Sequence, residues 1–523
     1  MEKEILYPID TADFSNIRKN GFVYVDKTRY IHSLTESKGT YYFLARPRRF
    51  GKSLFLDMLA AYFSGKRSLF NGLAIDALNP GEWVSYPVIR LNMSGKAFTD
   101  TWGLVRKVEN QLENLEKQYE VEGSDKDFDD RFDNLIRNVA NKYGKNVVIL
   151  IDEYDAPLSS TIDNSELQEV YREQLHGLYS VLKNTEAYIH FCMLTGVTRY
   201  GKVSVFSGLN NLNDITFDDE YAGICGITEE ELHANYQSGI SSLARKLNTT
   251  EVEIYQRLKK EYDGYHFSSS MVDVYNPYSI NHLFAKGKFE DYWCRSGVPT
   301  ILSKSLMQND FDVERLNGKK VTESEVSDLS MFTANPVPLF YQTGYLTIKG
   351  YEERRQRYIL GYPNREVEAA ILRNILKVYT NAKDDRQSLV YDMEDALEEG
   401  NPKEFIKILS SFLSSIPNQL HKYVDRYENY YHTIFYCLTT LIGLDVEAEF
   451  STSEGFIDIL VKTSDYIYII ELKVNGNAED AIKQIEERHY AAPFGADSRK
   501  KIKIGIGFST ETHNVDSYLI ENY

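Results

Sequence analysis

The chain has 523 residues, with 59 Lys and Arg against 77 Asp and Glu, which gives a formal net charge of −18. Hydrophobic residues make up 42% and charged residues 26%, an ordinary globular composition that excludes a disordered, collagen-like or coiled-coil chain. The length predicts about three or four domains. Because Lys and Arg carry phosphate binding, so acidic a chain is not expected to coat nucleic acid, and any nucleic-acid site must be local.

No targeting or membrane segment is expected. The first residues, Met1-Glu2-Lys3-Glu4, are not followed by the apolar stretch of a signal peptide. The longest apolar runs, such as 147–151, are far shorter than the ~20 residues that a membrane span needs. The four cysteines lie far apart without a CxxC pair, which argues against structural zinc and a disulfide framework. These features predict a reduced, cytoplasmic protein with no membrane partner.

Short apolar runs alternate with longer amphipathic stretches in the first half of the chain. The runs are rich in Val, Ile and Tyr, as buried parallel strands are, and cover 41–45, 88–92, 147–151 and 188–194. Helical periodicity lies between them, for example over 101–119 and 168–183. This alternation predicts a doubly wound α/β domain with a parallel sheet.

The second half begins with helices and ends with strands. Thr228 and Glu231 have the spacing of a capping box at a helix start. A mixed region from 276 to 362 follows, with short strands expected at 339–341 and 345–348, and then a helical stretch from 366 to 413. The last part predicts a small α/β domain, with strands at 446–450, 456–462, 466–474 and 501–507 and a helix at 478–490.

A phosphate-binding loop is predicted between the first strand and the next helix. Gly51-Lys52-Ser53 fits the end of the pattern G-x-x-x-x-G-K-[ST], in the required strand–loop–helix context. A phosphate there would meet unpaired N–H groups and the positive end of the helix dipole. Lys52 would contact the β- and γ-phosphates of ATP, and Ser53 would bind Mg²⁺. The predicted nucleotide-binding residues are Arg46, Pro47, Arg48, Arg49, Phe50, Gly51, Lys52, Ser53 and Leu54.

Arg46 departs from that pattern, because the general loop has its first Gly at this position. A Gly there eases the tight path of the backbone. Taken alone, the loop could therefore also be a basic turn that caps a helix.

Acidic and polar residues follow two further strands. Asp152 ends the apolar run 147–151 and could hold Mg²⁺, while Glu153 beside it could polarise the attacking water as general base. The alternative is an ordinary strand followed by an acidic turn. Thr195, at the end of the next strand, could sense the γ-phosphate. Arg199 could contact the nucleotide or a neighbouring subunit, or could form a surface ion pair.

Several segments resemble the bacterial AAA-ATPase-like family whose members carry a C-terminal nuclease-like domain. They include Tyr24-Val25-Asp26-Lys27-Thr28, the loop from Arg46 to Ser53, and Asp152-Glu153-Tyr154-Asp155. The resemblance continues through 262–265, 275–279, 341–346 and 361–367, so it covers nearly the whole chain. In this family, which is similar to archaeal ATPases and STAND-type NTPases, an Arg at position 46 is usual. The resemblance also implies a helical lid and a winged-helix-like segment before the C-terminal domain.

A second chemical site is predicted on the C-terminal hairpin. Asp458 lies on one strand and Glu471 and Lys473 lie on the next, where alternation places the last two on one face. Two carboxylates on adjacent strands can hold Mg²⁺ or Mn²⁺, and Lys473 can orient a water or stabilise a charged transition state. The alternative is a hairpin with a surface ion pair, since this pattern alone is common.

This layout resembles the PD-(D/E)XK nuclease superfamily. Gln484 matches the Gln on the helix that follows the hairpin, and Glu428 stands where the superfamily draws an acid from an upstream helix. Glu449, one strand before Asp458, is another possible acid. This branch commonly has Gly-Arg-x-Asp, and Phe456 replaces the Arg, which bears on phosphate contact rather than on the metal ligands.

Two basic runs could contact nucleic-acid phosphates, or could simply be solvated surface. They are Arg354-Arg355-Gln356-Arg357 and Arg499-Lys500-Lys501. DNA is favoured over RNA as the partner, and a homo-oligomer is possible.

Together these features predict a multidomain α/β protein that binds and hydrolyses ATP and carries a Mg²⁺-dependent nuclease domain. The expected segments are an AAA-like P-loop ATPase domain (1–225), a helical lid (226–290), a winged-helix-like segment (291–365), a helical linker (366–415) and a nuclease-like domain (416–523). An NTPase switch that binds nucleic acid or protein without cutting, or a signalling scaffold, remains open.

Overall fold

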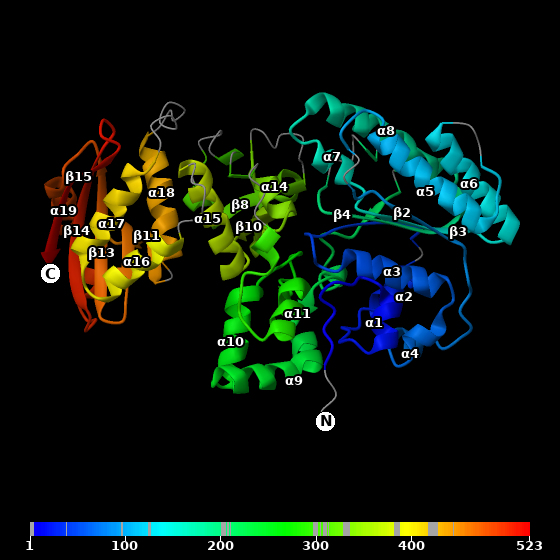
Figure 1. Cartoon of the computed structure of the whole chain (residues 1–523), viewed down its shortest axis with the longest axis horizontal. Helices are drawn as coiled ribbons and strands as arrows, with labels where there is room; N and C mark the ends of the chain where they lie inside the picture. Colours follow the sequence, from blue (N-terminus) through cyan, green and yellow to red (C-terminus); the bar gives the residue numbers. More distant parts are fainter. Residues whose placement is uncertain are drawn as a thin grey trace. The chain divides into compact units, whose positions relative to one another are not determined.

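Figure 1 shows a computed structural model of the chain. The structure describes residues 5–37, 39–95, 98–123, 127–199, 205–206, 209, 211–296, 302–303, 305–306, 311, 313–327, 335–380, 387–416, 427–442 and 444–523. The chain forms two compact units. The first contains Met1–Arg295 and Gly318–Glu366, and the second contains Ser296–Asn317 and Val367–Tyr523. The segment boundaries expected from the sequence divide the chain more finely and stay a prediction.

The first unit is built on a five-stranded parallel sheet with the order β2-β3-β4-β1-β5. The strands are β1 (Tyr41–Ala45), β2 (Val88–Asn92), β3 (Val147–Asp152), β4 (Ile189–Gly196) and β5 (Asn213–Asp214). The first four confirm the predicted strands, and β1 and β3 are buried along their whole length, as central parallel strands are. Because β4 lies between β1 and β3, the carboxyl ends of these three strands meet at one edge.

Helices cover both faces of this sheet (Figure 1). One face carries α1 (Phe14–Asn20), α2 (Arg29–Glu36), α3 (Lys52–Phe63) and α4 (Ala74–Leu78). The other carries α5 (Gly103–Tyr119), α6 (Phe128–Tyr143) and α8 (Ser165–Asn184), while the short α7 (Ala156–Ser160) precedes α8. The doubly wound arrangement predicted from strand–helix alternation is therefore confirmed.

Three helices form the lid of the first unit. They are α9 (Glu229–Leu247), α10 (Glu251–Tyr262) and α11 (Pro277–Lys286). The Thr228 hydroxyl accepts a hydrogen bond from the Glu231 amide, and the Glu231 carboxylate accepts one from the Thr228 amide, which confirms the predicted capping box. Apolar residues spaced along α9, such as Leu232 and Ile240, form the core of the lid with residues of α10 and α11.

A winged-helix-like segment completes the first unit. It consists of β8 (Lys319–Thr322), α13 (Glu323–Ser327), α14 (Val337–Gln342), β9 (Thr347–Glu352) and β10 (Arg357–Gly361), and its antiparallel sheet has the order β8-β10-β9. The strand expected at 339–341 is wrong, because these residues lie in α14. Pro336 and Pro338 stand at the start of that helix, where proline is favoured, and they outweigh the strand propensity of the apolar run. The strand expected at 345–348 begins instead at Thr347.

The second unit contains a mixed five-stranded sheet in sequence order. Its strands are β11 (Asp445–Thr452), β12 (Gly455–Lys462), β13 (Tyr466–Val474), β14 (Lys500–Ser509) and β15 (Asn514–Asn522). Only β13 and β14 are parallel, and β14 is joined to β13 through α19 (Ala478–Glu487), which packs on both. The predicted strands and helix are confirmed, whereas β15 was not predicted, since its only apolar run, 518–520, is short and its other residues are mostly polar.

Helices α16 (Gln387–Glu398), α17 (Pro402–Ser414) and α18 (Tyr427–Leu441) lie on the face of this sheet opposite α19 (Figure 1). The Tyr468 hydroxyl of β13 donates to the Leu397 carbonyl, so the helices before the sheet belong to its core. The helical stretch expected over 366–413 therefore consists of α15 (Arg365–Thr380), α16 and α17.

Gly344 should be intolerant of any side chain. Its φ is +88°, and a Cβ there would stand 2.6 Å from Pro47 Cβ in the phosphate-binding loop. We expect Gly344→Ala to lower the free energy of unfolding by about 1–3 kcal/mol through backbone strain and overpacking. Gly350→Ala is the matched control, because a Cβ there meets its neighbours only at ordinary contact distance, 3.4 Å or more. Equal denaturation midpoints for the two variants would contradict this expectation.

Candidate active sites

The predicted phosphate-binding loop joins the buried strand β1 to the first turn of α3. Gly51 is the N-cap of α3, with φ 99°, and no side chain caps the helix. Its first N–H groups are therefore available to an anion, and the helix dipole favours negative charge there. Arg49 also has a positive φ of 68°, which few residues other than Gly adopt.

Lys52 lies beneath the loop rather than in solvent. Its ammonium group donates to the carbonyl oxygens of Arg46 at 2.8 Å and Pro47 at 2.9 Å, and the residue is buried. Burial lowers the pKa of Lys52, because desolvation disfavours the charged form. An anion in the loop would offset that penalty, so the residue is suited to a phosphate ligand.

Arg46 serves the fold of the loop rather than offering its side chain to a ligand. Its guanidinium donates to the carbonyls of Ala45 (2.9 Å), Thr216 (2.8 Å) and Tyr221 (3.1 Å) and lies over the Phe267 ring at 4.4 Å. Only 1% of Arg46 is exposed. The arginine that stands in place of the pattern's glycine thus fastens the loop to the polypeptide after β5. Of the other predicted loop residues, Pro47 and Phe50 are buried, Arg48 and Arg49 are exposed, and Ser53 and Leu54 are half-buried.

The carboxyl ends of β3 and β4 bring the predicted acids next to this loop. Thr195 donates to Asp152 Oδ1 at 2.8 Å, so the hydroxyl orients this carboxylate. Glu153 follows with a φ of +52°, and burial raises the pKa of its carboxyl, with the Asp152 charge adding to the effect. A carboxyl with a raised pKa is suited to accept a proton from water.

Asp155 was not predicted as a site residue, yet it organises the end of β4. Its carboxylate accepts hydrogen bonds from the amides of Val197 (3.2 Å) and Thr198 (2.7 Å) and from the Thr198 hydroxyl. Only its place in the acidic segment after β3 could have indicated such a role.

Arg199 forms an ion pair, but a largely buried one rather than the surface ion pair that the sequence left open, and its contact with nucleotide or a neighbouring subunit stays a prediction. Its guanidinium donates to Asp214 and to the Ser327 hydroxyl, and its amide donates to the Gln342 side chain at 2.6 Å. The side chain is only 12% exposed. Arg199 thus joins the end of β4 to the winged-helix-like segment.

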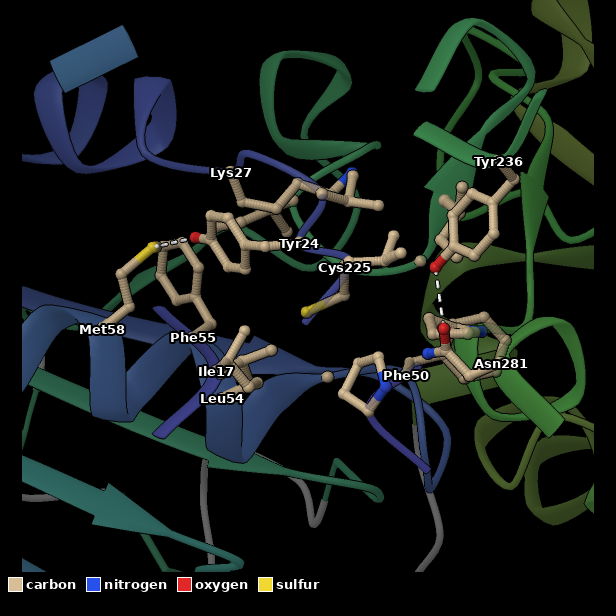
Figure 2. Close-up of a pocket in the computed structure, with 18 residues that line it drawn as sticks. Ile17, Tyr24, Lys27, Phe50, Leu54, Phe55, Met58, Cys225, Tyr236 and Asn281 are labelled. Atoms are coloured by element: carbon tan, nitrogen blue, oxygen red, sulfur yellow. Dashed lines mark hydrogen bonds between the residues drawn. The ribbon is translucent and has the colours of Figure 1, made fainter. Parts of the chain in front are cut away.

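An apolar pocket opens beside the start of α3 (Figure 2). It has a volume of about 80 Å³, and Ile17, Leu54 and Phe55 line it from the α1 and α3 side. Tyr24 and Lys27, both from the segment that carries the family resemblance, line it as well. Because Gly51 and Leu54 belong to both the loop and the pocket, a base attached to a bound phosphate chain could reach it.

Lid residues close the far side of this pocket. Tyr236 donates to Asn281 Oδ1 at 2.8 Å, which joins α9 to α11 (Figure 2). Lys27 donates to Glu231 at 2.6 Å and to the Gly223 carbonyl at 2.7 Å, which ties the N-terminal segment to α9. Sequence reasoning missed this pair, since the capping-box spacing alone explained Glu231.

The predicted cluster of the second unit is assembled in the structure. Lys473 donates to Glu471 Oε1 at 3.2 Å and to Gln484 Oε1 at 2.7 Å, and Gln484 donates to the same Glu471 oxygen. Asp458 Oδ2 accepts a hydrogen bond from the Leu472 amide at 2.7 Å. Four predicted residues from β12, β13 and α19 therefore lie at one place.

Glu471 has the properties of a metal ligand. Its Oε2 atom is buried and finds no hydrogen-bond donor among the residues that the structure describes. Burial and the neighbouring Asp458 charge raise the pKa of Glu471 to about 7. A divalent cation would satisfy the orphaned oxygen and offset the repulsion between the carboxylates, so Mg²⁺ or Mn²⁺ fits these donors.

The described part of the chain contains no group of three or more His, Cys, Asp and Glu that could hold a metal ion. The side chain of Glu428, on α18, and that of Glu449, on β11, lie outside the described residues. A third acid from the protein therefore stays a prediction.

A polar cleft with a volume of about 470 Å³ borders this cluster. Lys473 and Gln484 line it, together with the basic residues Lys483 and Arg488 and the acids Glu454, Asp480 and Glu487. Phe456, two residues before Asp458 on β12, is 59% exposed.

Of the predicted basic runs, Arg357 pairs with Glu352 at 2.8 Å and Arg499 with Asp497 at 2.7 Å. Arg354 and Arg355 are exposed at the turn between β9 and β10.

Comparisons with known proteins agree with the presence of one site in each of the two units. Residues 8–206 match the AAA-ATPase-like family, described as "Predicted AAA-ATPase", and residues 426–518 match the PD-(D/E)XK nuclease superfamily. A protein of Azotobacter chroococcum mcd 1, "Uncharacterized protein in vnfD 5'region", is 34% identical over 98% of this chain and 98% of its own length. The chain belongs to the AAA-ATPase-like family that carries a C-terminal PD-(D/E)XK nuclease superfamily domain.

A solved structure, that of the Aeropyrum Pernix ORC2 protein, covers 69% of this chain and 92% of its own length at 8% identity, with a TM-score of 0.21. A likeness this weak carries no argument. Within the described residues, no helix is both long and apolar enough to cross a membrane.

The metal assignment predicts a specific loss of binding. In a Lys52→Ala background, which silences the nucleotide site, we expect Asp458→Asn to weaken Mn²⁺ binding to the full-length protein at least tenfold. An amide is a much poorer ligand than a carboxylate. Calorimetric or electron-paramagnetic-resonance titration measures this, and Asp465→Asn, in the turn before β13, is the control. Unchanged Mn²⁺ affinity in Asp458→Asn would remove this residue from the site.

Proposed function

We propose that this family member is an ATP-gated, Mg²⁺-dependent nuclease that acts on nucleic acid, with DNA favoured over RNA. One observation supports it above the others: Asp458, Glu471, Lys473 and Gln484 are assembled on a chain whose other unit holds a phosphate-binding loop. A merely structural hairpin has no need of a buried carboxylate with an unpaired oxygen.

In the first unit, ATP would lie with its phosphates at the start of α3 and its base in the apolar pocket. Lys52 would exchange the loop carbonyls for the β- and γ-phosphates, and Ser53 with Asp152 would hold Mg²⁺, which neutralises phosphate charge. Glu153 would take the proton of the attacking water. Thr195 would keep Asp152 oriented, since the hydroxyl already donates to that carboxylate.

In the second unit, Asp458 and Glu471 would hold the cation, whose charge stabilises the scissile phosphate. Lys473 is held by Glu471 and Gln484, so its ammonium group has a fixed position from which to orient the attacking water. Lys483 and Arg488 would contact the strand that enters the cleft, because both line it.

Substitutions of Lys52 and Glu153 should affect two different steps, ATP binding and ATP hydrolysis. Lys52→Ala should lower ATP affinity at least a hundredfold, because it removes the cation that faces the phosphates. Glu153→Gln should bind ATP within about threefold of wild type and hydrolyse it at least a hundredfold more slowly, since an amide cannot accept the proton. Fluorescent-nucleotide binding and phosphate release measure the two steps, with exposed Glu479→Gln as control. Hydrolysis by Glu153→Gln at the wild-type rate would exclude it as the base.

Cleavage should depend on the second cluster alone. We expect Asp458→Ala, Glu471→Ala and Lys473→Ala each to reduce Mg²⁺-dependent cleavage at least a hundredfold while ATP hydrolysis stays within twofold. Full-length protein would be assayed on single- and double-stranded DNA and RNA, with Lys407→Ala, at a 74% exposed lysine of α17, as control. If wild type binds these substrates but cuts none of them with Mg²⁺ or Mn²⁺, the chain is a non-cleaving switch or scaffold instead.

A further inference from the structure

Trp293, the first residue of the short 3-10 helix Trp293–Ser296 after the lid helices, is hydrogen-bonded to the phosphate-binding loop. Its indole N–H donates to the Arg48 carbonyl at 3.0 Å, and Arg49 donates back to the Trp293 carbonyl at 3.1 Å. The Arg49 guanidinium also lies over the Tyr278 ring at 4.0 Å. Because Arg49 has a positive φ, which persists only where surrounding contacts impose it, these bonds help to fix the backbone of the loop.

Trp293 is held in turn by a buried carboxylate. Its amide donates to Glu366 Oε1 at 2.5 Å, and the Ser279 hydroxyl donates to Glu366 Oε2 at 2.8 Å. Glu366 is 2% exposed, and burial raises the pKa of its carboxyl to about 7. Among the described residues, no Lys, Arg or His forms an ion pair with it or lowers its pKa. An acid buried without a cation is costly, so its position depends on neutral donors, which are the Trp293 amide, the Ser279 hydroxyl and the Cys294 backbone.

These residues stand where the chain passes between its two compact units. The passages follow Arg295, Asn317 and Glu366. Trp293 is two residues before the first passage, and Glu366 is the last residue before the third, in the first turn of α15. The hydrogen bond from the Trp293 amide to Glu366 thus joins the chain next to two of the three passages. The indole of Trp293 is bonded to the phosphate-binding loop.

We propose that Trp293 and Glu366 are positioning residues that relay the state of the phosphate-binding loop to the chain passages leading into the nuclease unit. The proposal rests on nucleotide binding by the loop. Phosphate would draw Arg48, Arg49 and the loop N–H groups toward itself and change the bonds that the Arg48–Arg49 backbone makes with Trp293. The Trp293 amide would carry that change to Glu366 and so to the start of α15. Such a relay acts through a difference in free energy between two arrangements, one favoured by bound nucleotide.

The test follows amide hydrogen exchange in the full-length protein with and without a slowly hydrolysed ATP analogue, together with the Kd of the analogue. In wild type we expect the analogue to change exchange of residues 367–380 at least threefold. At analogue concentrations that the measured Kd shows to be saturating, Trp293→Phe, which removes only the indole donor, and Glu366→Ala should reduce that change to less than a third. Glu366→Gln, whose amide oxygen can still accept from the Trp293 amide, should restore at least half of it.

Two controls separate the relay from general destabilisation. Trp102→Phe, at a 64% exposed tryptophan, and Glu353→Gln, at an exposed glutamate, should respond as wild type does. If Glu366→Ala unfolds, Ser279→Ala replaces it, since it removes the only side-chain donor to the carboxylate that the structure describes and should also weaken the response.

Two results would overturn the relay. One is a wild type that binds the analogue with no change in 367–380. The other is a full response in both Trp293→Phe and the Glu366 variant. Failure of wild type to bind the analogue at all is a different result, because it removes the nucleotide site and the proposed function with it.

Discussion

The first unit depends on the burial of two cations, Arg46 and Lys52, at the turn 46–51 between β1 and α3. Arg46 and Lys52 have no ion-pair partner among the described residues, and both donate hydrogen bonds to main-chain carbonyls of the turn and its surroundings. These bonds fix the turn at the start of α3, where no side chain caps the helix and an anion would meet its first N–H groups. The order of the strands places Asp152 and Glu153, at the end of β3, on the same sheet edge as this turn.

The second unit also buries a charged side chain, but the buried group is a carboxylate rather than a cation. Glu471 is buried close to another carboxylate, and one of its oxygens is supported by Lys473 and Gln484 while the other has no donor among the described residues. A site of this kind is less stable empty than filled by a divalent cation. A ligand of opposite charge would offset the cost of burying Lys52 in one unit and Glu471 in the other, a phosphate in the first case and a metal ion in the second.

The sequence was most informative where a spacing has one physical consequence. A strand, a loop and a helix were predicted from the apolar run followed by Gly51-Lys52-Ser53. The alternation of side chains along a strand placed Glu471 and Lys473 on one face. It failed where tertiary contacts decide. No pattern shows that Arg46 turns inward, that Arg199 pairs with Asp214, or that residues 339–341 form a helix. Trp293 and Glu366, 73 residues apart, become partners only through the fold. The roles of the predicted site residues remain predictions, to be settled by the variants.

An ATPase and a nuclease on one chain are expected to be coupled rather than merely adjacent, because an ungated nuclease endangers the cell that makes it. The most direct measurement is the cleavage rate of full-length protein with ATP, a slowly hydrolysed analogue, ADP or no nucleotide, at matched free Mg²⁺. Coupling predicts that ATP or its analogue changes this rate at least several-fold, and that the change vanishes in Lys52→Ala. Identical rates under all four conditions would contradict it and leave two independent activities on one polypeptide.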